Sequence, residues 1–236
     1  FVDGWTITDK VDETGKEVGT PFANITAIVY KEQESGYLAG YAVVKEGYEK
    51  LGFTAGGGGT NPACNRFGYG FVQGANAAAA ELGKTVTIKY SYKFGDNFSA
   101  SSELQAQIAS WYAAGTEVVF ACGGSMFDSV KSAAAEYKDR NVKIVGVDTD
   151  QSGESEQVIT SAVKELATSV DIVLTQFYGG EWDSKLAGKT QNLGAAENAT
   201  GLPTATWRLT NFTVEQYKEV FEKIKNGTIV PDANTP

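Results

Sequence analysis

The sequence contains no histidine, and its 236 residues include only two cysteines, Cys64 and Cys122. Histidine is the commonest general base in enzymes and the commonest metal-binding side chain. Its absence excludes hydrolases that pair a serine or cysteine with histidine, and two cysteines cannot complete a structural zinc site. We therefore expect a binding protein rather than an enzyme, without a metal or cofactor. For acid–base catalysis only the carboxylate pair Asp148 and Asp150 would remain.

Basic charge and long apolar runs are also missing. The net charge is −9 and the pI is near 4.7, so the chain lacks the basic face that nucleic acids or anionic membranes require. No stretch approaches the roughly eighteen apolar residues of a membrane-spanning helix. The first residue is Phe1 and no signal peptide precedes it, so we expect a processed or truncated start.

What is present is an alternation of strand and helix patterns. Continuous or alternating apolar runs predict strands near 51–55, 85–92, 117–122 and 142–147, and residues at helical spacing predict helices near 67–82, 104–114, 125–137 and 213–224. Four such units in a row predict an α/β fold with an open, parallel, doubly wound sheet, in the strand order 2-1-3-4-5. Ligands bind such sheets beyond the carboxyl ends of the strands, here at 56–64, 94–98, 123–125 and 148–151.

The segments outside this sheet predict part of a second lobe. A strand pattern, NITAIVY, and a helix pattern precede residue 51, and VITSAV followed by an apolar helix comes after the fourth strand. We expect residues 1–36 and 160–187 to form a partial N-terminal lobe. Residues 37–159 and 188–236 would then form the C-terminal lobe.

Four segments together resemble the basic membrane protein family: AIVYKEQESGYLAGYAV, GFTAGGGGTNPACNRFGYGFVQGA, FGDNFSASSELQAQIASWYAAGTEVVFACGG and VGVDTDQSGESEQVITSAVK. Members of this family are substrate-binding lipoproteins of bacterial ABC importers, and the best-understood members bind purine nucleosides. The resemblance implies a type I periplasmic-binding-protein fold, whose two lobes close on a small ligand. It also implies an extracytoplasmic location, a lipid anchor on the full-length protein and an ABC permease complex as partner.

The resemblance also indicates what this sequence omits. The first strand–helix repeats of lobe one and the lipidated cysteine have no counterpart here, and the family's Asp–Asn ligand pair cannot be placed on any residue. We therefore expect lobe one to be incomplete. Such a lobe would expose apolar surface, and the chain could then self-associate.

The ligand site is expected after the predicted strands. The resemblance places Asp148 at the family's ligand-binding aspartate, where a carboxylate can accept hydrogen bonds from vicinal sugar hydroxyls. Asp150 either joins it or caps a turn. Phe67, in the family's Arg–Phe element, and Phe94 either stack on a flat base or pack as core.

Glycine and lysine residues complete the expected site. Gly123 and Gly124 either offer backbone N–H groups to the ligand or form a structural turn. Lys164 matches a family lysine near the cleft, with a solvated surface lysine as the alternative. Lys31 and Glu32 are expected to serve the hinge. The run from Gly56 to Gly59 lacks the Gly-Lys-Ser/Thr ending of a phosphate loop.

Two further points stay open at the level of sequence. Cys64 and Cys122 follow neighbouring strands, so a disulfide is plausible in an oxidising location, and two free buried thiols are the alternative. The ligand is expected to be a small polar molecule, most simply a purine nucleoside. The alternatives are a sugar or other small solute, or a sensory ligand-binding module of the same fold.

Overall fold

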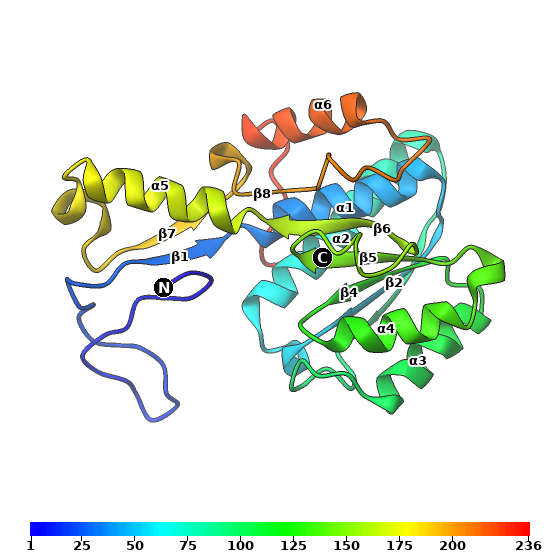
Figure 1. Ribbon diagram of the computed structural model, residues 1–236, viewed down its shortest axis with the longest axis horizontal. Coiled ribbons are helices and arrows are strands. Elements are labelled where there is room, and N and C mark those ends of the chain that lie inside the picture. The colour runs from blue at the N-terminus through cyan, green and yellow to red at the C-terminus, as the bar shows by residue number, and fades with distance from the viewer.

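The computed structural model describes residues 1–236 and shows two lobes of unequal size (Figure 1). The larger lobe is built on a six-stranded sheet in the order β3-β2-β4-β5-β6-β8. Its strands are β2 (Lys50–Ala55), β3 (Thr87–Ser91), β4 (Val118–Cys122), β5 (Lys143–Asp148), β6 (Val158–Lys164) and β8 (Thr200–Gly201). All neighbours pair in parallel except β8, which is antiparallel to β6. The predicted parallel α/β sheet and its 2-1-3-4-5 order are confirmed.

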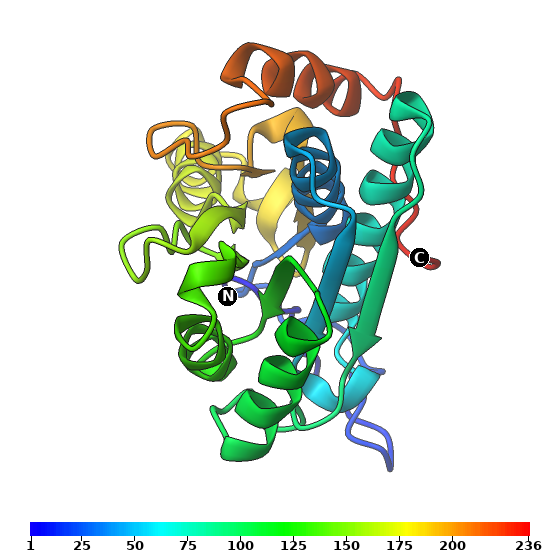
Figure 2. The ribbon, with the colours of Figure 1, turned by 90° about the vertical axis from the view of Figure 1, so that its right-hand side faces the viewer.

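Helices cover both faces of this sheet (Figure 2). One face carries α1 (Glu32–Glu46), α2 (Pro62–Leu82) and α6 (Val214–Lys225), and the other carries α3 (Ser102–Ala113) and α4 (Met126–Ala135). Strand β4 is buried along its whole length because its alternate side chains enter both cores. Phe120 packs with α1 and α2, whereas its neighbour Val119 packs with α3 and α4.

Helices α1 and α2 approach each other unusually closely. A Cβ atom on Gly40 would lie 2.0 Å from the Phe71 carbonyl oxygen, and one on Gly74 would lie 1.9 Å from the Tyr37 carbonyl oxygen. Glycine at these positions therefore lets the two backbones touch. A third close contact, in which a Cβ on Gly70 would lie 2.0 Å from the Gln33 carbonyl oxygen, fixes the N-terminal turn of α1 against α2.

The smaller lobe contains a parallel two-stranded sheet of β1 (Ala27–Tyr30) and β7 (Thr190–Leu193), with α5 (Leu166–Tyr178) beside it. Residues 1–26 form no regular element and join the lobe through isolated bridges such as Val2 with Ile28. Short helical turns complete the chain at Gly57–Gly59, Lys138–Arg140, Trp182–Leu186 and Ala195–Glu197. No helix is both long and apolar enough to cross a membrane.

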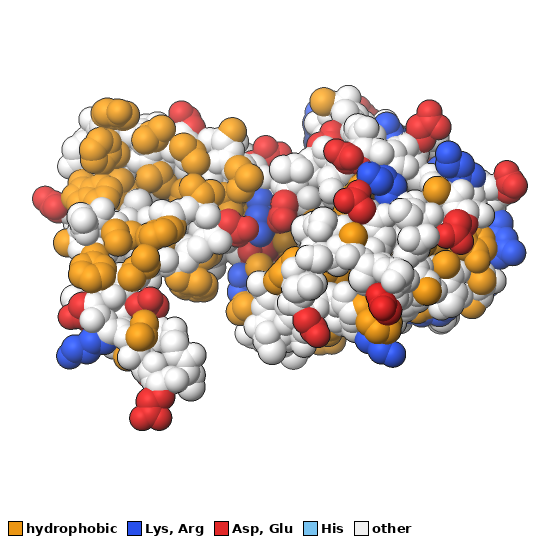
Figure 3. All heavy atoms as spheres, turned by 60° about the horizontal axis from the view of Figure 1, so that its bottom comes forward, with side chains coloured by type: hydrophobic (Ala, Val, Ile, Leu, Met, Phe, Trp, Pro, Cys, Tyr) orange, Lys and Arg blue, Asp and Glu red, His pale blue; other side chains and the backbone are white.

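Apolar side chains are exposed mainly on this smaller lobe, as expected (Figure 3). They lie on the N-terminal segment and along α5, and include Trp5, Val11, Val18, Phe22, Leu174, Phe177 and Tyr178. The self-association expected from such a surface stays a prediction.

The strand pairing differs from the expected lobe boundaries at residues 160 and 188. Strand β6 is buried at all seven positions and pairs with β5, so residues 160–164 lie in the larger sheet. Residues 190–193 pair with β1 and lie in the smaller one. The chain therefore crosses between lobes after β1, after β6 and after β7. The expected boundary at residue 36 differs too, because α1 begins at Glu32 and packs against α2, so residues 32–36 lie in the larger lobe.

Candidate functional site

The carboxyl ends of β4, β5 and β6 meet the N-terminus of α2 at a small cavity that faces the smaller lobe. The cavity has a volume of about 110 Å³. Five of the predicted ligand residues line it: Phe67, Gly123, Gly124, Asp148 and Lys164. Larger surface hollows exist, such as one of about 470 Å³ bordered by Lys138 and Glu156. That hollow lies at the amino ends of β5 and β6, at the opposite edge of the sheet from the carboxyl ends, and its charged residues form no ion pairs with one another.

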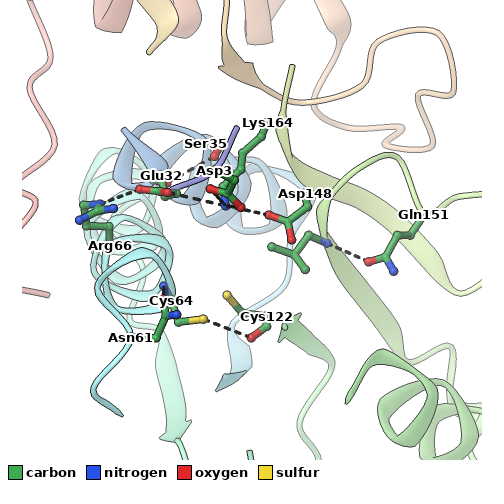
Figure 4. A network of polar contacts seen from close by, with 11 residues as sticks. Asp3, Glu32, Ser35, Asn61, Cys64, Arg66, Cys122, Asp148, Gln151 and Lys164 are labelled. Carbon is green, nitrogen blue, oxygen red and sulfur yellow. Dashed lines mark hydrogen bonds and ion pairs between the residues drawn. The ribbon is translucent and has the colours of Figure 1, made fainter. Parts of the chain in front are cut away.

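Lys164, the last residue of β6, is the centre of the charge network in this site (Figure 4). Its Nζ lies 2.9 Å from both carboxylate oxygens of Asp3 and 3.2 Å from Oδ1 of Asp148. A third carboxylate, Oε1 of Glu32, is 3.6 Å away. Burial alone would lower the pKa of Lys164, but the surrounding carboxylates outweigh that effect and raise the pKa. The amino group therefore stays protonated at any physiological pH.

Glu32 and Arg66 extend the network away from the cavity. Glu32 is the first residue of α1 and is 1% exposed, and its Oε2 accepts a hydrogen bond of 2.6 Å from Arg66 Nε on α2. Sequence reasoning assigned Glu32 to the hinge and gave Arg66 no role of its own. The polar run YKEQE gave no periodic signal, because its first helical residues are buried despite their charge.

Asp3 is the second residue that sequence reasoning missed. It follows the short bridge of Val2 to Ile28, which places its carboxylate on Lys164 from the side of the smaller lobe. The segment FVDG is too short to show a hydrophobic period, so the sequence analysis gave Asp3 no role. The signal that could have found Asp3 is a carboxylate directly after an apolar residue, as Asp148 comes directly after Val147 at the end of β5.

Asp148 has two unusual features for an aspartate at a strand end. Its φ angle is 65°, a left-handed conformation that is costly for a residue other than glycine and is often found at functional sites. Its buried Oδ1 lies in ion-pair range of Lys164 but has no hydrogen-bond partner. The side chain as a whole is 43% exposed, so the carboxylate remains open to a ligand that donates hydrogen bonds.

The two predicted aromatic residues have different positions. Phe67 lies within α2, and its 1% exposed ring packs edge-on against Phe120 with Lys164 Nζ 5.3 Å from its centre. Phe94 lies outside the cavity: it packs against the α3–α4 core, with Lys93 Nζ 4.7 Å from its ring centre. The ring that lines the cavity from that loop is Phe98.

The glycine pair beside Phe98 makes room for its ring and backbone. Gly123 and Gly124 have φ angles of 146° and 43°, and a Cβ on Gly124 would lie 2.9 Å from the Phe98 carbonyl oxygen. A Cβ on Gly123 would lie 3.0 Å from the Phe98 ring. The pair therefore forms the turn before α4 and at the same time borders the cavity.

Asp150 does not join Asp148 in the cavity. Its exposed carboxylate accepts hydrogen bonds from the Ser152 amide at 2.9 Å and from the Thr206 hydroxyl at 2.6 Å. Partial burial opposes ionisation, but these hydrogen bonds outweigh it and lower the pKa of Asp150. Asp148 and Asp150 therefore do not converge as an acid–base pair.

The two cysteines line the cavity as free thiols, so the disulfide considered from the sequence is not formed. Cys64 is held in the first turn of α2, where its amide donates to the Asn61 side chain, and its thiol points at the Cys122 carbonyl oxygen at 3.9 Å. Contact with the Cys122 thiol lowers the pKa of Cys64, whereas burial raises that of Cys122.

Comparison with solved structures supports the fold. A solute-binding protein of an ABC transporter system from Aeropyrum pernix K1 superposes with a TM-score of 0.73 at 18% identity, over 98% of this chain and 70% of that one. A transcriptional activator of the comK gene from Bacillus halodurans has a TM-score of 0.64 at 16% identity, over 91% and 70% of the two chains. These likenesses show a fold shared by transport proteins and regulators.

Sequence comparison identifies the family. Basic membrane protein B of Borreliella burgdorferi is 27% identical over 93% of this chain, and the ABC transporter nucleoside-binding protein BmpA of Lactococcus lactis subsp. cremoris is 28% identical over 78%. The chain spans 60% and 54% of the lengths of these two relatives. The family model for PnrA-like ABC transporter substrate-binding proteins matches residues 3–235. With almost the whole chain matched, the protein belongs to this family of PnrA-like ABC transporter substrate-binding proteins.

Proposed function

We propose that this protein is the solute-binding component of an ABC importer, that it works outside the cytoplasm, and that it binds a purine nucleoside between its two lobes without transforming it. A lipid anchor on the full-length protein and an ABC permease complex as partner belong to the same proposal. The observation that carries it is the pairing of Asp148 with Lys164 at the boundary between lobes. The name of the nucleoside-binding relative from L. lactis supports the choice of ligand.

The chemistry of the cavity suits a ribose. The Asp148 carboxylate accepts hydrogen bonds only, and its side chain is 43% exposed beside Lys164. Two vicinal hydroxyls would supply donors to it, while the Lys164 ammonium would donate to a hydroxyl or ring acceptor. The rings of Phe67 and Phe98 would supply apolar surface for the base. Since carboxylates outnumber cations here, a phosphate group would be repelled.

The cavity must widen before such a ligand can enter. Its 110 Å³ is well below the roughly 300–1,000 Å³ of typical small-molecule pockets. Asp3 comes from the smaller lobe and Lys164 from the larger one, so their ion pair spans the entrance. We expect the lobes to separate for entry and to close again when the ligand contacts both, because such a ligand stabilises the closed state.

A sugar is the second candidate. It uses the same hydroxyl–carboxylate chemistry, and the Phe67 ring is 1% exposed and packed against Phe120, which leaves little of its aromatic surface for a base. A calorimetric titration with inosine, guanosine, adenosine, hypoxanthine and ribose separates the two candidates. Binding of nucleosides with no response to ribose supports the proposal, and binding of ribose alone contradicts it.

Asp148→Asn tests the residue that carries the proposal. Replacing the charged acceptor by an amide is expected to weaken inosine binding by about 10–100-fold, since hydrogen bonds to charged groups contribute about 1.5–3 kcal/mol. Asp150→Asn is the matched control, two residues away and outside the cavity, and should leave the dissociation constant unchanged. Equal losses in both variants would mean that the loop conformation, and not the Asp148 carboxylate, controls binding.

A further inference from the structure

The Glu32 carboxylate pairs with two cations, Arg66 and Lys164. Its carboxylate touches Arg66 Nε at 2.6 Å with one oxygen and lies 3.6 Å from Lys164 Nζ with the other (Figure 4). Glu32 is 1% exposed, whereas the side chains of Asp3 and Asp148 are each 43% exposed. Because buried charges are screened least, Glu32 would compete most strongly for the ammonium of Lys164 if it had no other partner.

Arg66 limits that competition. While Glu32 is bound to Arg66, the Lys164 ammonium is left in closer contact with Asp3 at 2.9 Å and Asp148 at 3.2 Å, on the cavity side. Without Arg66, Glu32 would keep its full charge for Lys164. The ammonium would then move toward α1 and away from Asp148, the residue proposed to orient the ligand.

A purely structural role explains the Arg66–Glu32 pair poorly. Buried ion pairs are weak stabilisers because desolvation offsets most of their attraction. Helices α1 and α2 are already held together by backbone contact at Gly40 and Gly74, and by a second ion pair of Lys45 with Glu81 at 2.7 Å. What distinguishes the Arg66–Glu32 pair from that second pair is its contact with Lys164.

We propose that Arg66 is a positioning residue for the ligand site: by holding Glu32, it keeps the Lys164 ammonium against Asp148 and the cavity. This inference rests on the proposed function for its effect on ligand affinity. Its effect on Lys164 itself does not depend on which ligand the protein binds.

The test is a double-mutant cycle in the full chain, with inosine as the probe. Arg66→Gln is expected to weaken inosine binding by about tenfold, within the range of coupling between contacting residues. In the Glu32→Gln background the same change should have little further effect, because Arg66 acts only through Glu32. Arg66→Lys should recover part of the affinity. Glu81→Gln, which breaks the other ion pair between the same two helices, should leave affinity unchanged.

A ligand-free readout separates this inference from the proposed function. In lysine-labelled protein, the NMR signal of the Lys164 ammonium, identified by its loss in Lys164→Met, should shift in Arg66→Gln and remain in place in Glu81→Gln. An unchanged Lys164 signal in folded Arg66→Gln protein overturns the positioning role, as does a loss of affinity that is equal in both backgrounds. If the wild-type protein binds no nucleoside, the proposed function fails, and the Lys164 signal alone decides the role of Arg66.

Discussion

Lys164→Met is expected to destabilise the protein by about 3 kcal/mol at neutral pH and to abolish inosine binding, since removing one partner of a buried ion pair typically costs about 3–5 kcal/mol. We expect the lower end of that range because two of its three carboxylate partners, Asp3 and Asp148, are partly exposed. Methionine retains most of the apolar part of the lysine side chain, so the loss of stability measures the contribution of the charge. Urea unfolding, followed by circular dichroism, measures the change.

The pH dependence of that loss tests its electrostatic origin. The carboxylates around Lys164 raise its pKa, so its contribution to stability is complete below the pKa of an unfolded lysine, about 10.4, and is lost as the pH rises above that value. The difference in unfolding free energy between wild type and variant should therefore be smaller at pH 11 than at pH 8. The control is Lys185→Met, which removes an exposed ion pair with Glu181 and should change stability by less than about 0.5 kcal/mol. A loss of the same size at both pH values would point to packing instead.

The larger sheet was predictable because its strands are local, continuous apolar runs. The residues from 51 to 148 gave the strands, their order and the loops that border the cavity. Hydrophobic periodicity depends only on neighbours in the sequence, and parallel sheets bury both faces of their central strands. The end of the fourth predicted strand placed residues 148–151 at the site for the same reason, and the resemblance to the basic membrane protein family singled out Asp148 among them.

The charge network was harder to predict from the sequence, because its residues come from distant parts of the chain. Lys164 lies 161 residues from Asp3, and only the passage of the chain between the lobes brings them together. Strand β7 was missed because its sequence, TQNL, is short and polar and is recognisable only by its pairing with β1. The sequence did not distinguish Phe94 from Phe98: both lie in the loop after β3 with similar positive φ angles, 66° and 59°, and no sequence pattern indicates which ring lines the cavity.

The close glycine contacts between α1 and α2 predict a second large loss of stability. Gly70→Ala is expected to destabilise the protein by about 3 kcal/mol, at the upper end of the usual cost of overpacking a core. Alanine at this helical position would by itself stabilise the helix by up to about 1 kcal/mol. The added Cβ would however lie 2.0 Å from the Gln33 carbonyl oxygen, and a backbone atom cannot move aside as a flexible side chain can. Packing therefore outweighs helix propensity.

The control is a glycine whose surroundings leave room for a Cβ atom. Gly153→Ala, at a loop position where a Cβ meets no atom within 4 Å, should leave stability nearly unchanged. Thermal and urea unfolding of the two variants give the comparison, and a stabilised Gly70→Ala protein would show that the helices can separate at little cost.

Gln33 is next to Glu32 in α1, so pushing it away from α2 should also stretch the contact between Glu32 and Arg66. Gly70→Ala should then weaken inosine binding, whereas Gly74→Ala, one turn further from Glu32, should destabilise the fold with a smaller effect on affinity.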